Sequence, residues 1–120
     1  MRIAFDLDDT LWKVIHGCSD DCEFRQQHPS ERICDVHLRT TKQVPDYELI
    51  AVLKWFYQNG DYIHVWSAGG VDYAQTIVDK LGLEKMVTVI PKGSSEDMDL
   101  TFDDEAVTLG KVNIKVKRKW

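Results

Sequence analysis

The sequence lacks the features that mark membrane-spanning, secreted and disulfide-stapled proteins. It has no run of about 18 apolar residues, so we expect no transmembrane helix and no contact with a membrane. The N-terminus leads directly into a short apolar stretch and then acidic residues, without the charged-then-apolar pattern of a secretory signal. Three cysteines, an odd number, argue against a disulfide framework. We therefore expect a cytoplasmic protein.

Internal repeats and low-complexity segments are also absent, and the composition is that of one globular domain. The chain has 120 residues, of which 43% are hydrophobic and 29% charged, which is ordinary for a globular protein. A chain of this length can bury roughly two-thirds of the surface that it exposes when unfolded. We predict a single domain spanning residues 1–120.

Positive charge is concentrated at the C-terminus. The last ten residues contain five basic residues and no acid, so that the first 110 residues carry −10 of a total net charge of −5. One interpretation is a contact with a polyanion such as a nucleic-acid backbone. The other, which we favour, is an edge strand over residues 112–117, in which lysines alternate with apolar residues and oppose edge-to-edge aggregation.

Short apolar runs alternate with segments of helical periodicity. The runs predict strands at residues 2–5, 62–66, 86–90 and 100–102. Pro45 stands where proline is tolerated at a helix start, and Asn59-Gly60 is a stop signal. A second helix follows Gly70 and ends at Gly82. The expected apolar faces are Leu49, Val52, Leu53 and Phe56 in the first helix, and Ala74, Ile77, Val78 and Leu81 in the second.

This alternation predicts an α/β fold, in which a parallel sheet carries helices on its faces. Polar side chains follow each of the four predicted strands. The segment Asp6-Leu7-Asp8-Asp9-Thr10-Leu11 follows the first strand, Ser67 ends the second, Lys92 follows the third and Asp103-Asp104 follow the fourth. The carboxyl ends of parallel strands form the edge where ligands bind. Acidic side chains crowded there raise each other's pKa and cost stability, so we expect a cation or a reaction to use them.

The pattern Asp-x-Asp-x-Thr after an N-terminal strand, followed in order by Ser67, Lys92 and an acidic pair, resembles the haloacid dehalogenase-like phosphatases. The resemblance covers residues 1–15 and 45–110 and implies a Rossmann-like sheet. It does not cover residues 16–44, a short insertion after the first strand, where larger members of the family carry a cap domain. The resemblance therefore implies a small member with a minimal cap and an open active site.

The resemblance implies Mg²⁺-dependent hydrolysis of phosphate monoesters. Asp6 would be the nucleophile and form an aspartyl-phosphate, and Asp8 would act as general acid and then as general base. The Mg²⁺ ligands would be Asp6, the backbone carbonyl of Asp8 and Asp103, with Asp104 as a further ligand or a support. One Mg²⁺ and Lys92 would offset most of the charge of two carboxylates and a dianionic phosphate.

The substrate's phosphate would be held by the remaining loops. Ser67 would bond a phosphate oxygen, and Ala68, Gly69 and Gly70 would leave backbone N–H groups open near a helix N-terminus. Thr10 would orient the nucleophile loop. Lys92 is the expected phosphate-binding lysine, with Lys85 as the rival for that role.

All three cysteines and three of the four histidines lie in the unmatched segment, residues 16–44. The spacing of Cys18, Cys22, Cys34 and His37 is compatible with a tetrahedral zinc site. The segment has too few large apolar residues for a core of its own, and bound zinc could hold it together. The alternative, a loop with reduced thiols, stays open.

Two further functions compete with the phosphatase. A receiver-like phosphoacceptor domain has a similar length and similar residue types, but it needs an acceptor aspartate after its third strand. A non-catalytic, zinc-held binding module on a phosphatase scaffold is the other. For the phosphatase, the substrate is expected to be a phosphorylated small molecule or a nucleic-acid end, since lightly capped members either form homo-oligomers that close the site or act on large substrates.

Overall fold

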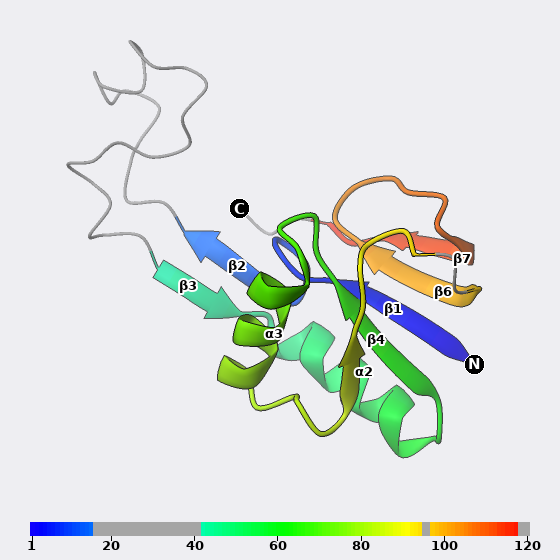
Figure 1. Cartoon of the computed structure of the whole chain (residues 1–120), viewed down its shortest axis with the longest axis horizontal. Helices are drawn as coiled ribbons and strands as arrows, with labels where there is room; N and C mark the ends of the chain where they lie inside the picture. The colour runs from blue at the N-terminus through cyan, green and yellow to red at the C-terminus, as the bar shows by residue number, and fades with distance from the viewer. Residues whose placement is uncertain (16–41, 95–96, 118–120) are drawn as a thin grey trace, which may run out of the picture.

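The computed structural model describes residues 1–15, 42–94 and 97–117. Within these ranges the chain forms seven strands and two helices (Figure 1). In chain order they are β1 (Arg2–Asp6), β2 (Trp12–Ile15), β3 (Lys42–Pro45), α2 (Tyr47–Gln58), β4 (Tyr62–Trp66), α3 (Val71–Lys80), β5 (Val87–Val89), β6 (Met98–Asp103) and β7 (Gly110–Lys115).

Five strands form one parallel sheet in the order β5-β4-β1-β6-β7. All four strand pairings in this sheet are parallel, with Phe5 of β1 opposite Val65 of β4 on one side and Phe102 of β6 on the other. The prediction of an α/β fold with a parallel sheet is therefore confirmed. β7 lies at the edge of the sheet, as predicted, although it begins and ends two residues earlier than the expected range 112–117.

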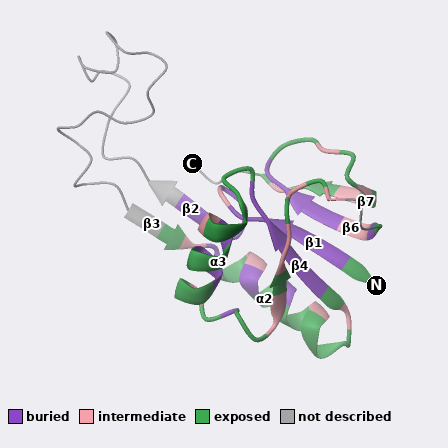
Figure 2. Ribbon diagram, in the orientation of Figure 1, coloured by how far each residue is buried: buried purple, intermediate pink, exposed green. Residues whose placement is uncertain are grey.

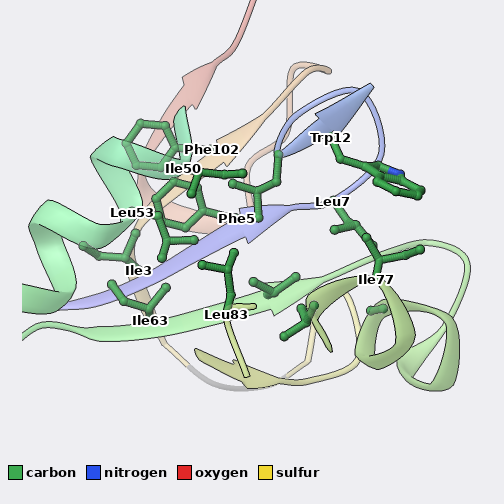
Figure 3. Packing of buried hydrophobic residues seen from close by; sticks show 14 residues of the cluster. Ile3, Phe5, Leu7, Trp12, Ile50, Leu53, Ile63, Ile77, Leu83 and Phe102 are labelled. Carbon is green, nitrogen blue, oxygen red and sulfur yellow. The ribbon is translucent and has the colours of Figure 1, made fainter. Parts of the chain in front are cut away.

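Both described helices pack on the same face of the sheet (Figure 3). Side chains of a strand alternate between its two faces, and the alternate residues Ile3 and Phe5 lie in one cluster with residues of both helices. The helix residues buried in this cluster are Ile50 and Leu53 of α2 and Ala74, Ile77 and Val78 of α3. A smaller cluster of Ala4, Trp66 and Met98, with Ile90 packed against it, is separate from this core. Among the described residues, the second face thus carries no helix of its own.

Three aromatic rings fix the centre of the core. Phe5 and Phe102 are register partners on β1 and β6, and their rings are stacked with centroids 4.6 Å apart and planes 5° apart. Phe56 of α2 lies 6.2 Å from Phe102 at 55°, so the helix is anchored to the same pair. Figure 2 shows that β1 is buried almost throughout, and this holds the acidic segment that follows it in a fixed position.

The prediction that Pro45 begins a helix is wrong. Pro45 is the last residue of β3, where it pairs with Trp12. Both strands of a two-stranded sheet are edge strands, and an edge strand tolerates a proline, which has no N–H to donate. Asp46 is the N-cap of α2, and its carboxylate accepts a hydrogen bond from the N–H of Leu49 at 3.2 Å. A carboxylate that accepts a first-turn N–H stabilises the start of a helix, and this decides the boundary.

The prediction that Val52 belongs to the buried apolar face of α2 is also wrong. Val52 is 38% exposed, whereas Ile50 is 6% exposed and contributes to the core. In α3, Ala74, Ile77 and Val78 are buried as predicted. The expected stops are confirmed, because Gly60 and Gly82 have φ angles of 86° and 71°, a left-handed conformation that glycine adopts without strain.

A two-stranded antiparallel sheet, which the sequence did not predict, closes the base of the insertion. β2 and β3 pair from Trp12 with Pro45 to Ile15 with Lys42, so the end of the expected insertion, residues 42–44, belongs to a strand. Two contacts tie this two-stranded sheet to α2. The N–H of Asp46 donates to the carbonyl of Leu11 at 2.8 Å, and Lys13 Nζ lies 3.4 Å from Asp46 Oδ2, with both side chains almost buried.

None of the described helices is long and apolar enough to cross a membrane.

Candidate active site

A pocket of about 200 Å³ lies where the loops after four strands of the parallel sheet meet. These loops follow β1, β4, β5 and β6, which are far apart in sequence and side by side in the sheet. The residues that line the pocket are Asp6, Asp8, Asp9, Ser67, Ala68, Lys92, Asp103, Asp104 and Glu105. The structure thus brings together most of the residues that the sequence singled out.

A tight turn after β1 places Asp6 and Asp8 in the pocket. The carbonyl of Leu7 accepts hydrogen bonds from the N–H groups of Thr10, Leu11 and Trp12 at 3.0–3.3 Å. Asp9 closes the turn with a φ of 62°, a conformation that aspartate tolerates better than most residues. Thr10 is fully buried, and its hydroxyl donates to Asp6 Oδ2 at 3.2 Å. The structure therefore places Thr10 against Asp6, behind the pocket wall.

Lys92 joins two of the carboxylates. Its Nζ lies 3.1 Å from Asp6 Oδ1 and 2.9 Å from Asp103 Oδ2, so it bridges the loops after β1 and β6. Lys85 is exposed and precedes β5, at the opposite end of that strand. Of the two lysines that competed for this place, the structure puts Lys92 in the pocket.

Asp6, Asp103 and Asp104 form a group that could hold a metal ion. Each offers a carboxylate oxygen, these oxygens lie within 4.8 Å of one another, and all three residues are buried. Oxygen ligands on carboxylates are the ligands that Mg²⁺ prefers. Three buried carboxylates facing one lysine leave an excess of negative charge, so the residues fit a divalent cation. The side chain of Asp8 is not part of this group in the described structure.

Burial and crowding change the acidity of Asp6. Burial raises the pKa of Asp6, the charge of Asp103 raises it further, and Lys92 offsets part of the increase, so that the pKa is about 7. For Lys92, burial lowers the pKa, but its bonds to Asp103 and Asp6 outweigh burial and leave the pKa above its usual value. Lys92 therefore stays charged at neutral pH, whereas Asp6 needs a further cation besides Lys92 to be fully ionised.

Asp8 is held by two donors that the sequence did not indicate. Tyr73 of α3 donates its hydroxyl to Asp8 Oδ1 at 2.6 Å, and Trp12 Nε1 donates to the same oxygen at 3.3 Å. Burial raises the pKa of Tyr73 to about 12, and the bond to Asp8 adds to this effect, so the tyrosine keeps its proton. With Oδ1 occupied by two donors, Oδ2 is the oxygen of Asp8 that remains available for proton transfer.

The loop after β4 differs in one respect from the expected open anion site. The N–H of Gly69 donates to Ser67 Oγ at 3.0 Å, and the N–H of Gly70 donates to the carbonyl of Ser67 at 3.1 Å. Two of the three N–H groups are therefore engaged within the loop, because the loop folds back on Ser67 before α3 begins. Ser67 and Ala68 line the pocket. Gly69 packs behind them, where a Cβ atom would lie 2.9 Å from the ring of Tyr73.

Two further acids line the pocket without having been assigned a role from the sequence. Asp9 belongs to the acidic segment after β1, and Glu105 follows the acidic pair and donates its N–H to Asp103 Oδ1 at 3.0 Å. The proposed zinc ligands Cys18, Cys22, Cys34 and His37 lie outside the described residues.

No protein-family model, curated protein or solved structure matches this chain, so any function assigned to it rests on the arrangement of its own residues.

Proposed function

We propose that this protein is a Mg²⁺-dependent phosphatase that hydrolyses phosphate monoesters through an aspartyl-phosphate on Asp6. The observation that carries the proposal is the meeting of Asp6, Lys92 and Asp103 in one pocket, with lysine–carboxylate distances of 3.1 and 2.9 Å. The strand order supports it. Counted along the parallel sheet alone the order is 3-2-1-4-5, which matches the first five positions of the Rossmann order 3-2-1-4-5-6, in which ligands bind at the carboxyl edge.

The first half-reaction transfers the phosphoryl group to the protein. A carboxylate oxygen of Asp6 attacks phosphorus, the bond from phosphorus to the ester oxygen breaks, and Asp8 gives its proton to the departing oxygen. Tyr73 and Trp12 occupy Asp8 Oδ1, so the proton is carried on Oδ2. The products of this step are an alcohol and phosphorylated Asp6.

The second half-reaction regenerates Asp6. Asp8, now ionised, accepts a proton from water, the water oxygen attacks phosphorus, and the bond between Asp6 and phosphorus breaks to release inorganic phosphate. Lys92 and Ser67 contact the phosphoryl oxygens throughout both steps. Asp6, Asp103 and Asp104 would hold the Mg²⁺, which supplies positive charge against the phosphate and favours the ionised form of Asp6.

The test is hydrolysis of p-nitrophenyl phosphate with and without Mg²⁺. Wild-type protein should turn over only with the metal, and Asp6→Asn should be inactive while remaining folded. Lys92→Gln should lose at least about a hundredfold in kcat/KM, since it contacts both the nucleophile and the transferring group, whereas the exposed Lys85→Gln serves as the matched control and should retain activity. Substantial turnover by Asp6→Asn would assign the nucleophile elsewhere.

A phosphoacceptor signalling domain is the less favoured alternative. Such a domain needs an acceptor aspartate after the third strand of its sheet, and here that strand, β5, leads to Lys92. The same experiment separates the two functions, because a phosphoacceptor would hold a stable phosphoryl group on an aspartate without sustained release of phosphate.

A further inference from the structure

A second groove adjoins the catalytic pocket. It encloses about 490 Å³, against about 200 Å³ for the pocket itself. Asp104 and Glu105 line both, so the two spaces share a wall. The rest of the groove is formed by Ala106, Lys115, Val116 and Lys117. Any group bound there would therefore lie beside the phosphoryl site.

The direction of β7 brings its lysines to the catalytic edge. β7 runs parallel to β6, so both strands end on the same side of the sheet (Figure 1). Lys115 is the register partner of Asp103, and paired residues on neighbouring strands project to the same face of a sheet. The N–H of Val116 donates to the carbonyl of Asp103 at 2.6 Å, which ties this end of β7 to a residue of the metal-binding group.

The charges around the pocket indicate what this groove accepts. Six carboxyl groups and one lysine line the catalytic pocket, a formal charge of −5, and a divalent cation reduces this only to −3. A phosphate monoester, itself an anion, therefore meets a negative mouth. Lys115 and Lys117 are exposed at the adjoining groove, where they offset the formal charge of its two acids, Asp104 and Glu105, so that the groove is neutral beside a negative pocket. Neither lysine forms an ion pair with a described residue.

The need to prevent edge-to-edge aggregation does not explain why Lys115 and Lys117 lie at the catalytic edge of the sheet. Lysines anywhere along β7 would serve that role. Lys111, near the opposite end of the strand, is paired with Asp99 at 3.3 Å. The two lysines without such a partner both stand at the catalytic edge, where they add positive charge next to an acidic pocket.

We propose that the groove beside Lys115 and Lys117 binds a second phosphate group of the substrate. The substrate is then a phosphate monoester that carries at least one further phosphate, whether the phosphodiester of a phosphorylated nucleic-acid end or the second phosphate of a small bisphosphate. This inference rests on the proposed phosphatase function and names the substrate class of the same site.

The test compares substrates with one and two phosphate groups. The kcat/KM with Mg²⁺ is measured for two pairs of substrates with the same kind of leaving group: thymidine 5′-phosphate with 5′-phosphorylated dithymidylate, and fructose 6-phosphate with fructose 1,6-bisphosphate. Wild-type protein should prefer the second member of at least one pair, and which pair shows the preference identifies the source of the second phosphate. In Lys115→Gln/Lys117→Gln the ratio within that pair should fall about tenfold, as two exposed charge contacts allow.

The matched control removes the same charge far from the groove. Lys80→Gln/Lys111→Gln alters the last residue of α3 and the paired lysine of β7, and it should leave the ratio as in wild type. An equal fall in both double variants would mean that overall charge, not the groove, sets the preference. A wild-type protein with no preference for a second phosphate, or an unchanged ratio in the groove variant, would also overturn the proposal.

A binding measurement separates the groove from the catalytic function. Isothermal titration calorimetry with Asp6→Asn and Mg²⁺ measures the affinity for 5′-phosphorylated dithymidylate and for fructose 1,6-bisphosphate without turnover. Adding Lys115→Gln/Lys117→Gln should weaken binding of the preferred ligand about tenfold. If wild-type protein hydrolysed no phosphate ester, the phosphatase proposal would fail, and this titration would still decide whether the groove binds a second phosphate.

Discussion

Asp6 should destabilise the metal-free protein at neutral pH. Its pKa in the folded protein is about 7, against 3.8 for the ordinary side chain, because it is buried beside Asp103. The folded state therefore holds a proton on Asp6 more tightly than the unfolded state does. It follows that the free energy of unfolding falls as the pH rises from about 4 to about 7, by about 1.4 kcal/mol for each unit of the shift, or about 4 kcal/mol in all.

Asp6→Asn removes this penalty, because the amide cannot ionise and can still accept a hydrogen bond from Lys92. We expect the variant to be more stable than wild type in EDTA. The difference should be larger at pH 8 than at pH 5 by about 2–3 kcal/mol, since roughly 40% of the penalty has already developed at pH 5. Urea unfolding of both proteins at the two pH values gives the four free energies, and comparing them cancels groups common to both.

Mg²⁺ provides the second part of the measurement. A cation bound to Asp6, Asp103 and Asp104 should raise the unfolding temperature of wild type at pH 8, and should do so less in Asp6→Asn, which has lost one charged ligand. A difference between the two proteins that stays constant from pH 5 to pH 8 would refute the reasoning, because it would show that Asp6 ionises in the folded state as it does in water.

Three further predictions follow from single contacts and from the unmatched segment. Tyr73→Phe removes the 2.6 Å hydrogen bond to Asp8. In steady-state kinetics, kcat/KM should fall about tenfold with an alkyl phosphate, whose leaving group needs a proton, and by less with p-nitrophenyl phosphate. Equal losses with the two substrates would mean that Tyr73 has only a structural role. Gly110→Ala places a Cβ atom 2.8 Å from Thr101 Cγ2 and 3.2 Å from the carbonyl oxygen of Met98. The free energy of unfolding, measured by urea denaturation, should therefore fall by about 1–3 kcal/mol. An unchanged free energy would contradict this close packing. Elemental analysis of protein never exposed to chelator should find about one zinc per chain, and finding none would remove the proposed zinc site.

The strands of the parallel sheet could be predicted because their signals are local. Each strand of the parallel sheet except β7 is a short apolar run, and the polar residue that follows it marks the carboxyl edge. Parallel alignment then brings Asp6, Ser67, Lys92 and Asp103 together without further information, as the pocket confirms.

The contacts that could not be predicted depend on residues distant in sequence. Tyr73 is 65 residues from Asp8, and its position on α3 resembles that of any aromatic residue at the start of an amphipathic helix. β2 and β3 are four residues each and pair across the insertion, so neither has a recognisable partner nearby. The start of α2 was misassigned because proline and aspartate stand next to each other, and only the bond to Leu49 identifies Asp46 as the cap.

The ladder of β2 and β3 brings the two ends of the insertion together. Ile15 and Lys42 stand opposite each other, so the chain leaves and re-enters the scaffold at neighbouring points. A linker of a few residues between them would complete an ordinary hairpin without rethreading any other strand, and a whole foreign module with adjacent termini could be grafted there instead. The described part of the fold therefore offers one place at which the segment between Ile15 and Lys42 could be exchanged without altering the strand order of the parallel sheet.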